Sequence, residues 1–210
     1  MSLVELIADA DERGLTVSGL ACLDRCVSLL GGDDEILRPL WASLADDSDA
    51  EEWATRLEQA RVKLDTGDGP DAQHADAAGA APVVPAAAAA SASAEGEAAL
   101  LARWMLAAAP AVRSAAGVRE WADACSVAAL RVHQLLDASA AADPSSVESY
   151  RAGGTEGMSP LVAAELRRQI TVLELLAGHG SGGLRQALAV STEGRRVLRA
   201  VVSRRARGRA

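Results

Sequence analysis

Cys22 and Cys26 come nearest, by residue type and spacing, to a metal or redox site. They lie four positions apart on a predicted helix, so their thiols share one face and could supply two ligands of a zinc ion. Zinc needs two more ligands, and the other Cys and His residues outside the predicted linker, Cys125, His133 and His179, belong to the far half of the chain. Because free cysteine is among the most buried residue types, we interpret the pair as core residues and assign no metal or cofactor.

A glycine-rich stretch, GHGSGG at residues 178–183, precedes a predicted helix as a phosphate-binding loop would. It lacks the Lys-Ser/Thr ending of such loops, and a helix is expected before it where the dinucleotide fingerprint needs a strand. Ser181 and His179 are a local pair that cannot form a catalytic triad by spacing alone. An enzyme or metal protein using this turn or the cysteine pair is therefore the less favoured alternative, and no catalytic residue is assigned.

The C-terminal segment combines a short apolar stripe with a run of arginines. Val197, Leu198, Val201 and Val202 fall on one side of a predicted basic amphipathic helix. Three uses of this helix remain open: packing on its own domain, binding an acidic partner or the acidic half of the chain, and contact with nucleic acid or an anionic membrane. The partner-binding residues that we predict are its arginines, namely Arg195, Arg196, Arg199, Arg204, Arg205, Arg207 and Arg209.

Charge is segregated along the chain. Residues 1–97 carry a net charge of −14 and residues 98–210 a net charge of +6, within a total of −8. Such a split favours partners or self-contacts of complementary sign. The acidic pI of about 4.9 argues against nucleic acid, and with no Phe and one Tyr the chain has few stacking platforms for single strands.

The elements that must position these residues are predicted to be helices. Alanine and leucine are abundant, and four Trp with Leu and Val must supply the bulk of the packing. Apolar stripes and helix-start signals indicate four helices within the first 66 residues, with a break at Gly14 and another at Gly31. Pro39 predicts a kink or a delayed start in the third of them. Towards the C-terminus, separate helices are expected near 184–190 and from Thr192.

The fold class expected is all-α, with two small helical bundles or helical hairpin modules joined by a disordered Ala/Pro-rich linker. The division is an acidic N-terminal helical module at 1–66, the linker at 67–95, and a C-terminal helical module at 96–210 with a basic amphipathic last helix. The linker contains three prolines and no large apolar periodicity. The alanine-rich end of the linker, after Pro85, could join the following helix.

The expected compartment and function of the protein rest on features that its sequence lacks. No apolar run reaches the roughly 18 residues of a membrane span, and the N-terminus lacks the basic region of a secretory signal. Three cysteines are an odd number, which argues against a disulfide framework. We therefore expect a cytoplasmic protein, and its composition is typical of high-GC bacteria. No motif carries a specific family resemblance. The predicted function is a non-enzymatic helical interaction or regulatory protein that docks on a protein partner or on itself through charge-complementary surfaces. The alternative is a nucleic-acid-associated regulator that uses the arginine-rich tail.

Overall fold

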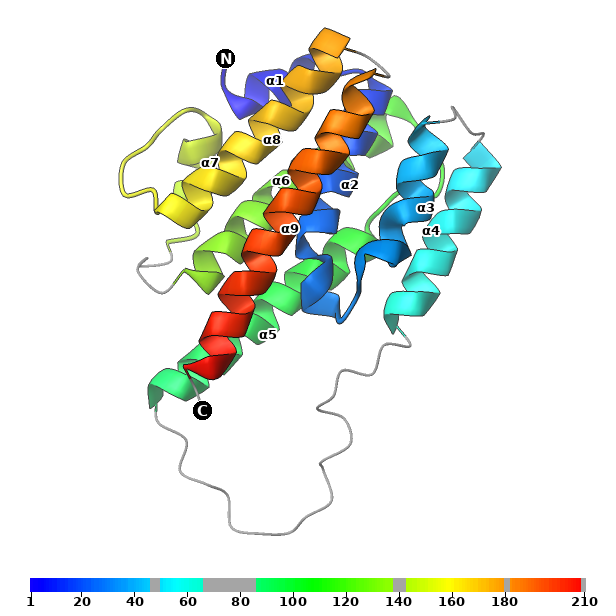
Figure 1. The fold of residues 1–210 in the computed structure, drawn as a ribbon. Helices are drawn as coiled ribbons and strands as arrows, with labels where there is room; N and C mark the ends of the chain where they lie inside the picture. Colours follow the sequence, from blue (N-terminus) through cyan, green and yellow to red (C-terminus); the bar gives the residue numbers. More distant parts are fainter. Residues whose placement is uncertain (46–49, 66–85, 138–142, 180–181, 209–210) are drawn as a thin grey trace.

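The computed structural model describes residues 1–45, 50–65, 86–137, 143–179 and 182–208, with only the backbone at 34, 50, 65 and 86–92. Within these ranges the elements are helical and the predicted all-α class is confirmed (Figure 1). Their order is α1 (Leu3–Asp9), α2 (Glu12–Cys26), the 3-10 helix η1 (Val27–Leu30), α3 (Asp34–Ala45), α4 (Ala50–Asp65), α5 (Ala86–Ala107), α6 (Ala115–Leu136), α7 (Ser146–Arg151), α8 (Pro160–His179) and α9 (Gly183–Arg207).

Helix α2 is the centre of the molecule. Every residue from Gly14 to Cys26 is buried, because α6, α8, α9, α3 and α5 all pack against it. A helix that is apolar around most of its circumference requires cover on all sides. Helix α6 approaches α2 closely at Gly19, since a Cβ placed there would lie 2.6 Å from the Trp121 ring of α6.

Residues of the predicted N-terminal and C-terminal modules share one core. Leu20, Leu23 and Trp53 belong to the same cluster as Trp121 of α6 and Leu198 of α9. The expected modules 1–66 and 96–210 are therefore in contact through their apolar interiors. Of the predicted linker, residues 67–85 lie outside the described residues and 86–95 form the first turns of α5, as the alanine tract after Pro85 allowed.

Two helix boundaries differ from those predicted. Gly14 does not end the first helix, because the Asp11 side chain accepts a hydrogen bond from the Gly14 N–H at 2.6 Å and begins α2 there. Helix α9 is continuous from Gly183, without the predicted break before Thr192. Ser191, at that point, is buried and donates its hydroxyl to the Ala21 carbonyl at 3.1 Å, so it belongs to the packed face of one long helix.

The α3–α4 hairpin is held to the rest by side-chain hydrogen bonds to the α5–α6 connection. Trp53 donates its indole N–H to the Pro110 carbonyl at 2.8 Å, and Arg61 donates to the Ala109 carbonyl at 2.8 Å. Pro39 lies inside α3, which begins at Asp34, so the helix start is not delayed by the proline. In the part of the chain that the structure describes, no helix combines the length and apolarity needed to cross a bilayer.

Candidate functional site

All three cysteines lie in the core. Cys22, Cys26 and Cys125 are fully buried, and burial raises the pKa of the Cys22 thiol to about 12 and the pKa of the other two well above the ordinary value. A thiol held neutral is a poor nucleophile. The complete burial of Cys22 and Cys26 confirms the interpretation of the pair as core residues. Over the described ranges, no group of three or more His, Cys, Asp or Glu side chains is placed to hold a metal ion.

The glycine-rich stretch does not assemble a reactive group in the described residues. Gly178 and His179 form the exposed last turn of α8, and α9 begins at Gly183. The His179 Nδ1 atom lies 3.3 Å from the Leu175 carbonyl of its own helix. Ser181, the other member of the local pair, lies outside the described residues.

Two of the predicted partner-binding arginines, Arg195 and Arg205, make hydrogen bonds to other helices. Arg195 is only 4% exposed and donates from Nη1 to the Asp24 carboxylate of α2 at 2.7 Å. Arg205 donates to the Leu136 carbonyl at 3.1 Å and lies 3.4 Å from the Glu95 carboxylate. Position 195 belongs to the packed stripe of α9, one turn from Ser191 and Leu198, which explains why its guanidinium is turned inward.

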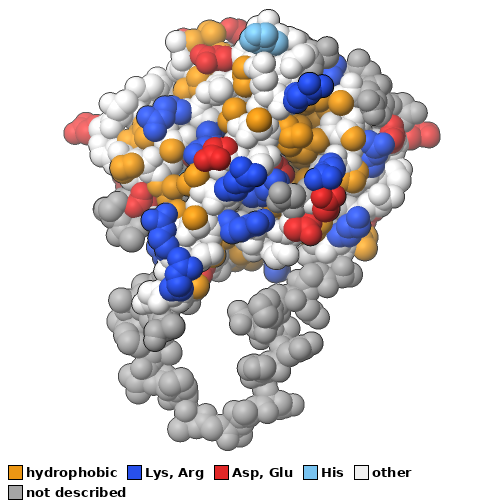
Figure 2. Space-filling model, in the orientation of Figure 1, with side chains coloured by type: hydrophobic (Ala, Val, Ile, Leu, Met, Phe, Trp, Pro, Cys, Tyr) orange, Lys and Arg blue, Asp and Glu red, His pale blue; other side chains and the backbone are white. Residues whose placement is uncertain are grey.

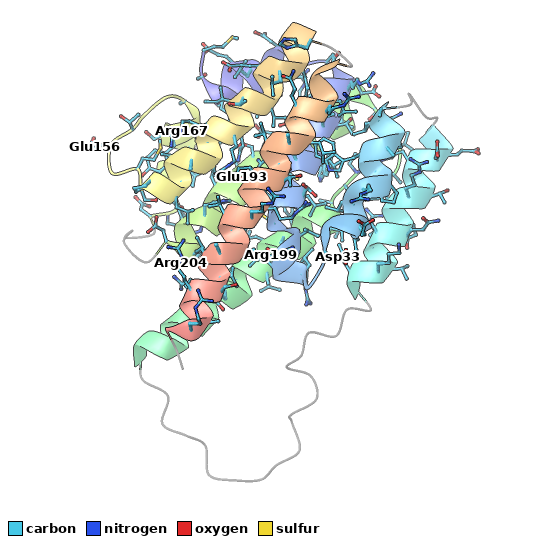
Figure 3. All side chains as sticks on the ribbon, viewed as in Figure 1. Asp33, Glu156, Arg167, Glu193, Arg199 and Arg204 are labelled. Atoms are coloured by element: carbon cyan, nitrogen blue, oxygen red, sulfur yellow. The ribbon has the colours of Figure 1, made fainter. Side chains whose placement is uncertain are left out.

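The other described C-terminal arginines lie on the outer side of α9. Arg196, Arg199, Arg204 and Arg207 are exposed, at spacings of three to five positions that keep them on one side of the helix, while Arg209 lies outside the described residues. Arg167 of the neighbouring helix α8 is exposed on the same side (Figure 3). We call these five residues the basic face. Figure 2 shows Lys and Arg side chains over α8 and α9 on this side of the molecule, and others over α3 and α4.

A shallow groove between α8 and α9 forms part of this side of the molecule. It has a volume of about 490 Å³ and is lined by Ala164, Arg167, Arg168 and Thr171 of α8 and by Ala189 and Glu193 of α9. Alanine at two of these positions leaves room for another chain to approach the helices. Glu193 is an acidic residue among the arginines in Figure 3, so the groove offers both signs of charge to a partner.

A buried polar cluster, which the sequence analysis did not identify, lies beneath the basic face. Arg25 of α2 donates from Nε to Glu165 Oε2 at 2.8 Å and from Nη2 to Glu165 Oε1 at 2.6 Å, and both side chains have no exposed surface. Gln169 donates to the same carboxylate at 3.0 Å and accepts a hydrogen bond from Ser126 of α6 at 2.7 Å. The bidentate ion pair thus joins α2 to α8, and the hydrogen bond from Ser126 to Gln169 joins α6 to α8.

His133 of α6 completes this cluster. Its Nδ1 atom lies 2.7 Å from the Ala129 carbonyl, which assigns the proton to Nδ1, and its Nε2 atom lies 3.6 Å from Glu165 Oε2. Burial lowers the pKa of His133 despite the neighbouring carboxylate. For Glu165, burial acts to raise the pKa, but the charge of Arg25 and the hydrogen bonds from Arg25 and Gln169 outweigh it, and the pKa lies below the ordinary value.

The chemistry of the buried cluster is structural in this arrangement. A general acid or base must come within hydrogen-bonding reach of its substrate, and Arg25, Glu165 and His133 are fully enclosed. The sequence signal that could have revealed the cluster is a charged residue inside an otherwise apolar stripe, as at Arg25 in α2 and Glu165 in α8. The exposed arginines, in contrast, are accessible to another molecule.

No protein-family model matches the chain, and no significant match was found among curated proteins or among solved structures.

Proposed function

We propose that this protein is a non-enzymatic interaction protein that holds an acidic protein partner on the basic face of α8 and α9. The observation that carries the proposal is the gathering of Arg167, Arg196, Arg199, Arg204 and Arg207 on one side of the molecule (Figures 2 and 3). Complementary charge steers association and selects partners, and arginine is well suited to bidentate contacts with carboxylates.

Two features make a protein partner a better fit than nucleic acid. The chain as a whole carries a net charge of −8, so it repels a duplex with about one charge per 1.7 Å more strongly than a protein partner that is acidic only in part. The groove beside the basic face includes Glu193 together with two alanines, and this mixture suits a peptide segment with both acidic and small residues better than a uniformly anionic backbone.

The proposal is tested by the binding of a labelled copolymer of Glu and Ala, measured by fluorescence anisotropy at about 20 mM and about 300 mM salt. The variant Arg196→Glu/Arg204→Glu reverses two charges of the basic face, and we expect it to bind roughly tenfold or more weakly than the natural protein at low salt. The matched control, Arg38→Glu/Lys63→Glu, reverses two exposed charges on α3 and α4 and should retain the affinity.

Equal affinity in both variants would contradict a role for the basic face. A labelled DNA duplex is the second probe in the same assay. If the duplex binds and loses affinity only in Arg196→Glu/Arg204→Glu, while the Glu/Ala copolymer does not bind, the nucleic-acid alternative replaces the proposal.

A further inference from the structure

An exposed apolar pair lies on α5, which contributes no residue to the basic face. Leu100 is 66% exposed and Trp104, one turn later, is 46% exposed. The other three tryptophans, Trp41, Trp53 and Trp121, are all buried. Exposed tryptophan next to exposed leucine is uncommon on a monomeric surface and is typical of the anchor residues of a protein interface.

Small, bulky and charged residues flank this pair on the same side of α5. Gly96, Glu97, Leu100, Arg103 and Trp104 are all exposed and repeat at three- and four-residue spacing, so they share one side of the helix. The Gly96 surface is open, since a Cβ placed there would meet no atom within 4 Å. Glu97 keeps 52% of its side chain exposed although it lies 3.5 Å from Arg131 of α6.

These residues are self-complementary around Leu100. Two copies of a helix can cross antiparallel at the same residue. A residue that lies n positions before the crossing in one copy then faces the residue that lies n positions after the crossing in the other copy. Crossing at Leu100 places Glu97 opposite Arg103 and Gly96 opposite Trp104 in both halves of the contact. The opposite charges meet, and the bulky indole faces the residue that has no side chain.

From this juxtaposition we propose that the chain forms a two-fold symmetric homodimer through the Gly96–Trp104 face of α5. A two-fold contact uses the same surface on both subunits, which is the commonest symmetry of oligomers. A parallel pairing would instead put Glu97 opposite Glu97 and Trp104 opposite Trp104, with like charges facing. The occupant of this face is therefore a second copy in the antiparallel orientation.

The contact is modest in size and adjoins further apolar surface. It spans about two to three helical turns, which places it among the small interfaces of weak or transient dimers. At Arg103 the stripe meets a groove of about 370 Å³, between η1, α4 and α5. Its lining combines apolar and charged residues, namely Leu30, Val62, Leu64, Leu106 and Ala107 with Glu58, Arg61 and Arg103. The dimer goes beyond the proposed function, because α5 contributes no residue to the basic face.

Sedimentation velocity of the full chain, from about 5 to 500 µM, measures the self-association. The natural protein should shift from monomer to dimer over this range. Leu100→Asp places two carboxylates on the two-fold axis and should weaken the dimer at least about tenfold. Val112→Asp is the control, because Val112 is also exposed but lies in the connection after α5.

The orientation is tested by reversing the charges that face each other. Glu97→Arg and Arg103→Glu should each weaken self-association, since each creates like-charge contacts. An equimolar mixture of the two variants should form a heterodimer, because both facing pairs are then of opposite charge, and the double variant should dimerise again. Arg131→Gln controls for the internal contact of Glu97 and should leave the dimer unchanged.

A natural protein that stays monomeric at every concentration would overturn the proposal. So would a dimer that Leu100→Asp leaves intact, because it must then form through another surface. A mixture of Glu97→Arg and Arg103→Glu that associates no better than either variant alone would overturn the antiparallel pairing. Circular dichroism of each variant confirms that the helical fold is retained.

Discussion

The Arg25–Glu165 pair shows how one buried contact joins distant parts of the chain. The two residues are 140 positions apart, and their side chains are completely removed from solvent. Taking two charges out of water is costly, so such a pair contributes little compared with an apolar pair of the same volume. Removing one partner is a different matter, because the remaining charge is left buried without compensation.

We therefore expect Glu165→Gln to lower the free energy of unfolding by about 3–5 kcal/mol. The control is Glu148→Gln, which removes an exposed carboxylate 3.1 Å from Arg151 and should cost about 0–1 kcal/mol. Urea denaturation followed by circular dichroism measures both changes. Similar losses in the two variants would show that the buried carboxylate does not compensate Arg25.

His133 makes stability depend on pH above the range in which carboxylates titrate. Its pKa is lowered by burial, with Arg25 and Arg168 acting in the same direction and Glu165 and the Ala129 carbonyl acting against them. The unfolded chain therefore binds a proton near pH 6.5, where the folded protein does not yet do so. Stability contributed by neutral His133 is complete above that pH and declines as the pH falls below it.

The corresponding prediction concerns the slope of stability with pH. Between about pH 7.5 and 5.5 the natural protein should lose stability, and His133→Asn should lose less over the same interval because the group that titrates is gone. The comparison uses urea midpoints at each pH, so a constant destabilisation by the substitution cancels. Parallel slopes in the two proteins would rule out His133 as the titrating group.

Helix α9 is positioned by its close approach to α2 as much as by the burial of its apolar side chains. Gly194 faces α2, and a Cβ there would lie 2.3 Å from Arg25 Cδ and 3.0 Å from Arg168 Cδ. The absent side chain leaves the space through which the Arg25 stem reaches Glu165. The same helix presents Ser191 and Arg195 to α2 and keeps Arg196 and Arg204 outside, so one element serves both the core and the basic face.

Gly194→Ala should consequently destabilise the protein, although alanine is intrinsically about 1 kcal/mol better than glycine inside a helix. The buried Arg25 stem cannot move aside without breaking its bonds to Glu165. Gly178→Ala in the last turn of α8 is the matched substitution, because a Cβ at that position meets nothing within 4 Å. It should be neutral or slightly stabilising in thermal denaturation, and a stable Gly194→Ala variant would refute the packing argument.

For the molecule as a whole, the N-terminal residues depend on the C-terminal helices for their core. Helix α2 is covered by α6, α8 and α9, so residues 1–65 by themselves would expose most of its apolar surface. The contacts between the two parts do not follow the charge segregation of the sequence. Asp24 pairs with Arg195 in the expected sense, but Arg25 pairs with Glu165 in the opposite sense.

Separate fragments should therefore be unfolded alone and folded together. We expect residues 1–65 to show little helix by circular dichroism, and co-expressed fragments 1–65 and 86–210 to purify as one helical complex. Because apolar burial dominates the contact, the complex should persist at about 0.5 M salt, where exposed ion pairs are screened. A cooperative unfolding transition of 1–65 alone would show that the N-terminal module folds independently.

Sequence patterns were enough to predict the helical class, the core position of the cysteines and the amphipathic character of the last helix. Each of these depends on local quantities: intrinsic propensity, residue burial tendency and three- to four-residue periodicity. Periodicity also placed most helices, and it failed where a side chain decided the boundary, as the Asp11 cap did at Gly14 and the buried Ser191 did in α9.

The packing of the helices sets which charged residues pair in the interior and which face outward. From the sequence, Arg195 and Arg196 were both predicted to bind a partner. In the structure, packing against α2 buries Arg195 beside Asp24 and leaves Arg196 on the basic face. It also brought Arg25, Glu165 and His133 together and left Leu100 and Trp104 uncovered. These outcomes depend on how helices distant in the chain pack together, which the periodicity of a single helix does not encode.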